Sequence, residues 1–143
     1  MKTEPYEVSL VKINPFKVKG PIIGRVVAVL DLILENRGMK LIHPRSRALV
    51  KSSIFELAVT DEAESSPGKV VNRVGYIGFI EVTQGGVAVV GDNVYIGNRL
   101  LGEIVGFNED HVPNHITVLV RSKELTTGFK FGVEVNDEVQ IVM

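Results

Sequence analysis

The chain has 143 residues, enough for one domain with a substantial core, and its 16 basic and 17 acidic residues leave a formal charge of -1. A chain so close to neutral has no overall field to hold a nucleic acid backbone or an anionic membrane surface, so neither partner is expected. The absence of cysteine excludes disulfides, thiolate metal sites and a cysteine nucleophile. We therefore expect a single domain over residues 1–143, in a reducing compartment such as the cytoplasm.

Hydrophobic residues make up 45% of the chain but aromatic residues only 6%, so the core is mostly Val, Ile and Leu, which fit pleated sheet surfaces. The N-terminus lacks the apolar core of a secretory signal, and the longest apolar run, residues 26–34, is interrupted by Asp31. Composition therefore predicts a mainly β protein that is neither exported nor anchored in a membrane by its own signal.

The first half of the chain begins with an alternating segment, residues 6–13, that predicts a strand. Residues 22–34 are rich in β-branched side chains and apolar on both faces, as in a strand covered on both sides. The turn at residues 35–38 and the apolar residues 39–42 predict a hairpin with that strand.

The middle of the chain is less regular. Residues 48–54 fit a helical turn and a strand equally well, and we interpret them as irregular structure leading into a strand at 54–60. Residues 61–68 are polar, acidic and aperiodic, which is typical of a mobile surface loop. Residues 69–82 predict a strand, with a bend or bulge at Gly75 and Gly78.

The second half predicts a hairpin of residues 93–96 and 99–107 around Gly97-Asn98, followed by strands at 116–120 and 133–142. The hexapeptide GDNVYI at 91–96 also recurs as NDEVQI at 136–141. In each copy a residue that tolerates positive φ precedes an aspartate that can accept hydrogen bonds from nearby amides, and a strand follows. The pattern predicts an all-β fold: a small, closed or nearly closed antiparallel barrel with long loops at one end.

These two segments resemble the GD box of the cradle-loop and RIFT-type β-barrels, a group that includes the second domain of translation elongation factors. The resemblance covers roughly the last third of the chain, and the second copy has Asn136 where the box has glycine. It implies a barrel. Because such barrels serve in transport, translation, catalysis and scaffolding, it implies no particular function.

The densest group of metal-ligand residue types is Glu109-Asp110-His111-Val112-Pro113-Asn114-His115. His111, His115 and Asp110 form a candidate metal site, which His43 completes if the two loops meet; a divalent ion such as zinc accepts these ligands. The alternative is that these histidines cap turns or face solvent, since Pro113 prevents a regular helical His-x-x-x-His geometry.

A second candidate site gathers positive charge and hydroxyls in one segment, and its proposed ligand-binding residues are His43, Arg45, Arg47 and Lys51. Guanidinium groups suit phosphate or carboxylate. The alternative is a solvated face opposite the acidic loop.

These observations favour a non-catalytic module that binds a small anion or a protein partner, without a cofactor, and that acts as an assembly module or as a small subunit of a larger complex. A homo-oligomer is expected, because a small barrel has few places to cover both faces of strand 22–34. The alternative function is a metal-dependent enzyme that uses the loop histidines to activate water or an oxygen substrate.

Overall fold

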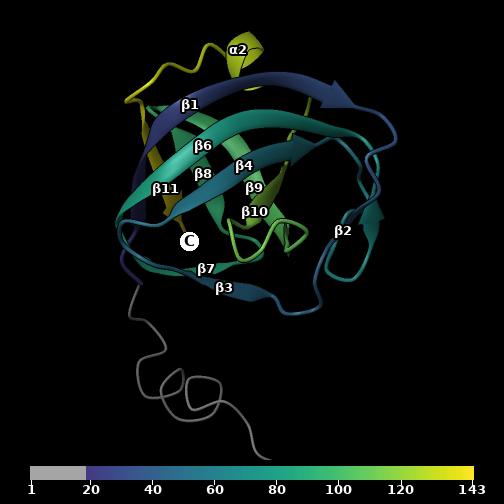
Figure 1. Cartoon of the computed structure of the whole chain (residues 1–143), viewed down its shortest axis with the longest axis horizontal. Helices are drawn as coiled ribbons and strands as arrows, with labels where there is room; N and C mark the ends of the chain where they lie inside the picture. The colour runs from purple at the N-terminus through teal and green to yellow at the C-terminus, as the bar shows by residue number, and fades with distance from the viewer. Residues whose placement is uncertain (1–18) are drawn as a thin grey trace, which may run out of the picture.

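The computed structural model describes residues 19–143, so the strand predicted at 6–13 lies outside the described part. Seven strands form a closed barrel, as Figure 1 shows, in the order β1-β11-β8-β9-β10-β4-β6. The prediction of an all-β barrel is confirmed. The barrel strands are β1 Ile22–Leu34, β4 Ile54–Thr60, β6 Val74–Gln84, β8 Asn93–Ile96, β9 Arg99–Asn108, β10 Thr117–Arg121 and β11 Glu138–Val142.

The barrel closes along two seams between its early strands (β1, β4, β6) and its late strands (β8 to β11). At one seam β1 pairs with β11 antiparallel, and at the other β4 pairs with β10 parallel. The parallel pair departs from the purely antiparallel arrangement predicted, because strands far apart in the chain meet here without a hairpin to set their direction. It places Thr117 opposite Glu56.

Two hydrophobic clusters stabilise the barrel. The larger fills the interior, and the smaller lies on the outer face of β4, β6, β9 and β10. The ribbon of β2 (Met39–Lys40) and β5 (Val70–Val71) contributes Met39 and Val71 to the outer cluster. The predicted hairpin of residues 39–42 with strand 22–34 is therefore wrong: β2 pairs with β5, because covering the outer cluster buries Met39 completely.

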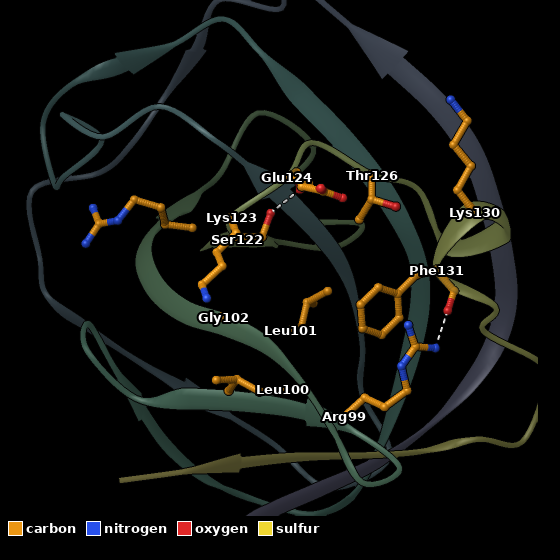
Figure 2. Close-up of a pocket in the computed structure, with 11 residues that line it drawn as sticks. Arg99, Leu100, Leu101, Gly102, Ser122, Lys123, Glu124, Thr126, Lys130 and Phe131 are labelled. Carbon is orange, nitrogen blue, oxygen red and sulfur yellow. Dashed lines mark hydrogen bonds between the residues drawn. The ribbon is translucent and has the colours of Figure 1, made fainter.

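β1 matches the predicted strand 22–34, and its second face is partly covered from within the chain. Helix α2 (Gly128–Phe131) lies outside β1 in Figure 1. Thr127 donates a 2.8 Å hydrogen bond to the Asp31 carboxylate, which explains an acid inside an apolar strand. The Arg99 guanidinium lies 3.8 Å from the ring centroid of Phe131 and donates to its carbonyl oxygen (Figure 2). These contacts hold α2 against the barrel.

The repeated aspartates occupy equivalent turns, as the sequence predicts. Asp92 accepts a 2.9 Å hydrogen bond from the amide of Val89, and Asp137 accepts one of the same length from the amide of Glu134. The preceding residues, Gly91 and Asn136, have φ of 100° and 78°. β8 and β11, which follow the two turns, pair with each other.

The start of segment 48–54, expected to be irregular, belongs to strand β3 (Ser46–Leu49), which pairs with β7 (Gly86–Val89). Both lie along the lower side of the barrel in Figure 1. Leu49 and Ala88 join the interior core from this ribbon. Burial of one side chain from each strand thus stabilises a strand where the periodicity of the sequence fits a helical turn equally well.

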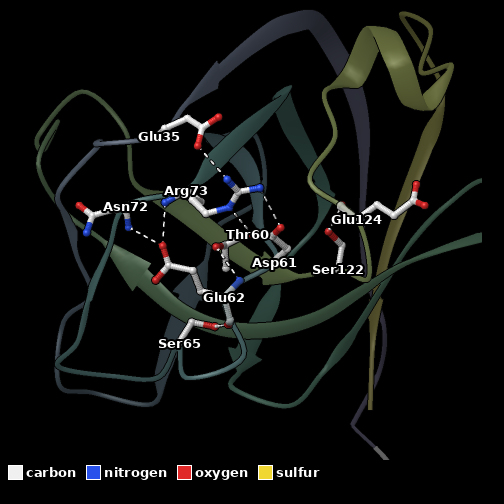
Figure 3. A network of polar contacts seen from close by, with 9 residues as sticks. All are labelled: Glu35, Thr60, Asp61, Glu62, Ser65, Asn72, Arg73, Ser122 and Glu124. Carbon is white, nitrogen blue, oxygen red and sulfur yellow. Dashed lines mark hydrogen bonds and ion pairs between the residues drawn. The ribbon is translucent and has the colours of Figure 1, made fainter.

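The acidic segment 61–68 contains no strand, and two of its three acids, Asp61 and Glu62, are bonded to residues 72 and 73 (Figure 3). Arg73 pairs with Asp61 at 3.0 Å and with Glu35 at 2.7 Å. Glu62 accepts hydrogen bonds from the amides of Asn72 and Arg73. The acids thus connect this segment to the start of β6.

Candidate metal centre

The candidate site is built on the outer face of three neighbouring barrel strands. Strand alternation turns Phe55, Leu57 and Val59 into the interior core, so Glu56 of β4 points outward. The pairing register places Phe79 of β6 on one side of Glu56 and Thr117 of β10 on the other. The Thr117 hydroxyl donates a 2.7 Å hydrogen bond to Glu56 Oε1. This fixes a carboxylate that is only 7% exposed.

The loop between β9 and β10 covers this row of side chains. Its two acids are held by arginines from elsewhere in the chain: Arg47 binds Glu109, and Arg37 binds Asp110 at 3.0 Å. The buried side chain of Asn108 also accepts a hydrogen bond from the backbone amide of Asp110 and donates one to the backbone carbonyl of Lys40 in β2. The loop is therefore anchored at the end from which its histidines project.

Arg37 extends the anchor to Tyr76 by donating a 2.8 Å hydrogen bond to the phenol oxygen. The pKa of Tyr76 is raised, first by burial, which disfavours the phenolate. Burial lowers the pKa of Arg37, but its bonds to Tyr76 and Asp110 outweigh this and raise it. Arg37 therefore stays cationic at neutral pH.

The two loop histidines stack on each other above Glu56. Their ring centroids are 4.9 Å apart, and the rings of His115 and Phe79 pack edge to face with centroids 5.1 Å apart. His115 Nδ1 bonds to the Asn114 side-chain oxygen at 2.7 Å. An amide oxygen only accepts, so this bond forms in the tautomer that is protonated at Nδ1 and has its lone pair on Nε2. That Nε2 is buried and has no hydrogen-bond partner.

One ligand atom each from Glu56, His111 and His115 lies within 4.8 Å of the other two. No ion pair or hydrogen bond joins Glu56 to either imidazole within residues 19–143. Ligands of one tetrahedral ion, with bonds of about 2.1 Å, lie about 3.4 Å apart. A limit of 4.8 Å is wider than this, so the three side chains have to draw closer to share one ion, and His111 is the exposed member of the group.

Of the predicted metal ligands, the fold thus brings together His111 and His115 but neither Asp110 nor His43. Asp110 is paired with Arg37 instead. His43 is exposed, and its ring lies against Gly68. Among the described residues, no other group of three or more ligand-type side chains converges in this way.

The predicted anion-binding residues, His43, Arg45, Arg47 and Lys51, do not converge either. Arg45 lines a shallow hollow of about 270 Å³ with residues 65–67. Arg47 reaches the histidine loop through Glu109, and Lys51 lies in an exposed turn between β3 and β4.

Glu56 is the member of this group that the sequence analysis missed. It is the one acid in the strand Ile54–Thr60, whose other members are apolar apart from its last threonine. An acid inside an apolar strand is costly to bury unless it has a partner. The sequence therefore indicates that Glu56 has a partner. It does not indicate which one, because Glu56 is 55 positions from His111 and only the β4–β10 pairing brings the two together.

A hollow of about 420 Å³ lies beside the site. His115 and Asn114 form part of its wall, and the rest is mainly apolar side chains of the β3–β4 region, including Leu49, Ile54 and Phe55. Of the three residues His111, His115 and Glu56, His115 alone lines this hollow.

The fold and this site define a class: a closed β-barrel with two histidines and a carboxylate gathered on its outer face. The chain belongs to the family of unknown function DUF6917, whose family model matches residues 16–142. No curated protein and no solved structure matches the chain. No helix within residues 19–143 has the length and apolar character needed to cross a membrane.

Proposed function

We propose that this protein binds a divalent transition-metal ion through His111, His115 and Glu56. The observation that carries the proposal is the buried Nε2 of His115, which has a lone pair and no partner, next to a buried carboxylate. Burying a polar atom without a hydrogen bond costs about 1–3 kcal/mol. A metal ion bound there removes this cost, because the nitrogen donates its lone pair to the ion.

Zinc fits this donor set best. Two imidazoles and one carboxylate are ligands of catalytic zinc sites, where three protein ligands leave a position for water or substrate. Magnesium and calcium prefer all-oxygen ligands, and nothing in the group supplies a thiolate. Two neighbouring residues hydrogen-bond to these ligands. Thr117 orients Glu56, and Asn114 favours the tautomer of His115 that has its lone pair on Nε2.

A metal-dependent enzyme is the second candidate function, and the adjacent hollow favours it. With three protein ligands, a bound ion keeps at least one position for an exchangeable ligand. Zinc in such a position lowers the pKa of bound water to about 7 and so supplies a hydroxide nucleophile. A binding module and an enzyme of this kind share the same metal site, so metal binding is tested first.

The test is a zinc titration of chelator-treated protein by isothermal calorimetry, with zinc content measured after dialysis. We expect one ion per chain for the wild type and none retained by the His111→Ala/His115→Ala variant. His43→Ala is the matched control, since it removes the third histidine from outside the cluster and should still bind one ion. Equal zinc uptake by the double variant and the wild type would overturn the proposal.

Three further expectations extend the proposal without depending on it. We place the protein in the cytoplasm, which the absence of cysteine supports. We also propose kinship with the GD-box barrels, supported by the matching geometry of the Asp92 and Asp137 turns. A homo-oligomer is supported by exposed apolar side chains such as Leu32 and Phe129, and light scattering of the purified protein tests it.

A further inference from the structure

A second hollow, of about 620 Å³, lies at the opposite end of the strands that carry the histidine loop. Arg99 to Gly102, at the start of β9, and Arg121, at the end of β10, line it, whereas Asn108 and Thr117 adjoin the histidine loop. We propose that this basic hollow binds an organic anion with a phosphate or carboxylate group and an apolar body.

The charge of the lining is the first observation. Four cationic side chains, Arg99, Arg121, Lys123 and Lys130, surround the hollow, with Glu124 as its one acid. The whole chain, by contrast, carries a formal charge of -1. Such a concentration of positive charge in a concave site attracts an anionic ligand.

The four cations differ in how much of their charge is already paired. Arg121 binds Glu103 at 2.6 Å and the carbonyl of Ser65, so it is largely neutralised. Arg99 is bound only to the ring and carbonyl of Phe131. Lys123 and Lys130 have no ion-pair partner within the described chain. Arg99, Lys123 and Lys130 are therefore the cations left to bind an anion.

Figure 2 shows how these side chains lie. The Lys123 side chain extends toward Gly102, whereas the ammonium of Lys130 points away from the other labelled residues. Arg99 keeps its guanidinium against Phe131, so its position is fixed before a ligand arrives. Such preorganisation lowers the entropy lost on binding.

The apolar part of the lining is the second observation. Leu100 is 53% exposed although it is a large hydrophobic residue, and Leu101 and Phe131 continue the apolar surface beside it. A solvated cationic face needs no such wall. Cations and apolar groups side by side fit a ligand that has an anionic head and an apolar body.

The experiment is a ¹⁵N-¹H correlation NMR titration of metal-free protein in chelating buffer, with phenyl phosphate, benzoate and inorganic phosphate as separate probes. We expect saturable shifts in the amides of residues 99–102, 121–124 and 131 with phenyl phosphate and benzoate. Phenyl phosphate should bind about tenfold more tightly than inorganic phosphate, because only the former contacts the apolar wall. Tighter binding of phenyl phosphate would assign a phosphate head group to the ligand, and tighter binding of benzoate would assign a carboxylate.

The variant Arg99→Ala/Lys123→Ala should weaken phenyl phosphate binding at least tenfold, whereas Lys51→Ala, which removes an exposed lysine from outside the hollow, should not change it. A Lys123→Ala single variant serves if loss of the Arg99 contacts with Phe131 unfolds α2. Absence of saturable shifts, or equal affinity in the wild type and a folded Lys123→Ala variant, would overturn the inference. Because the titration excludes metal, its failure leaves the metal-site proposal intact.

Discussion

The two ends of strands β9 and β10 differ in how their polar side chains are buried and paired. At the histidine end, the polar groups are buried: His115 Nε2 has no hydrogen bond, and Glu56, which accepts one from Thr117, is only 7% exposed. At the other end, the cations are exposed and the hollow is open. A buried unpaired atom costs the folded protein free energy, whereas an exposed lysine costs almost nothing. The first end therefore implies a ligand more strongly than the second.

The largest effect is expected from Glu56→Gln, which removes the charge from the histidine end and leaves the basic hollow unchanged. Zinc affinity should fall at least 100-fold, about 2.7 kcal/mol, because an amide oxygen is a much weaker ligand than a carboxylate. The metal-free variant should be at least as stable as the wild type, since glutamine retains an acceptor for Thr117 without a buried charge.

Calorimetry and urea unfolding measure these two quantities. The matched control is Glu109→Gln. Glu109 is an acid of the histidine loop that is paired with Arg47, and its substitution should change zinc affinity less than tenfold. If both variants bound zinc as the wild type does, Glu56 would not be a ligand.

The next largest effect is expected from Gly128→Ala, which displaces α2 and so disrupts the basic hollow instead of the histidine end. A Cβ at this position would lie 1.9 Å from the carbonyl oxygen of Ile77, so α2 has to move away from the barrel. We expect a loss of about 2 kcal/mol in unfolding free energy and loss of anion binding, with zinc binding retained.

Thermal unfolding and the two ligand titrations together check this result. Gly20→Ala is the control, because a Cβ there meets nothing within 4 Å, and it should leave stability and both ligands unaffected. Loss of zinc binding in Gly128→Ala would mean that the two ends are not independent.

The sequence predicted well those features that depend on neighbouring residues. The strand over 22–34, the hairpin around Gly97-Asn98 and the paired aspartate turns all follow from local alternation and turn chemistry. Pairings between distant segments were not predictable in this way: β2 with β5, and β10 with β4 in parallel. Because side-chain alternation repeats every two residues in any strand, it does not specify which strand lies alongside.

The same limit applies to the two sites. His111 and His115 are four positions apart, and the sequence analysis found them; Glu56 comes from a strand that only the fold brings to them. Arg99, Lys123 and Phe131 come from three separate elements and form no cluster in the sequence. The predicted basic cluster, by contrast, is dense in sequence, but its members point to different neighbours.

The two aspartate turns lie in the barrel that carries both ends, and their substitution should lower the free energy of unfolding by a smaller amount. Asp92→Ala and Asp137→Ala each remove an acceptor from one backbone amide, at a cost of about 1 kcal/mol in unfolding free energy. Asp92→Ala should cost more, because it also leaves the Lys19 ammonium, 2.7 Å away, without its partner. Urea unfolding of the two variants measures the difference, and an equal or reversed order would contradict the role of Lys19.

The smallest effect concerns pH. Hydrogen bonds from Arg73 lower the pKa of the Asp61 carboxyl below its usual value, against the opposing effect of burial. A lowered folded-state pKa means that this pair stabilises the protein above the ordinary carboxyl pKa, about 3.9, and that the stabilisation is lost as pH falls below it.

Asp61→Asn should therefore reduce the dependence of stability on pH below about 4, as measured by acid unfolding. Glu64→Gln, which changes an exposed acid of the same segment, should keep the wild-type dependence. The difference should shrink in high salt, because both partners of the pair are partly exposed. A difference that persisted at 1 M salt would assign the effect to local packing instead.

The most direct test of the metal site is a crystal structure of zinc-soaked protein with data collected on both sides of the zinc absorption edge. We predict one strong anomalous peak per chain, with His111, His115 and Glu56 each about 2.1 Å from it and His115 bound through Nε2. The basic hollow at the other end of β9 and β10 should show no peak. A zinc peak elsewhere with none at these three residues, or no peak at all, would contradict the account.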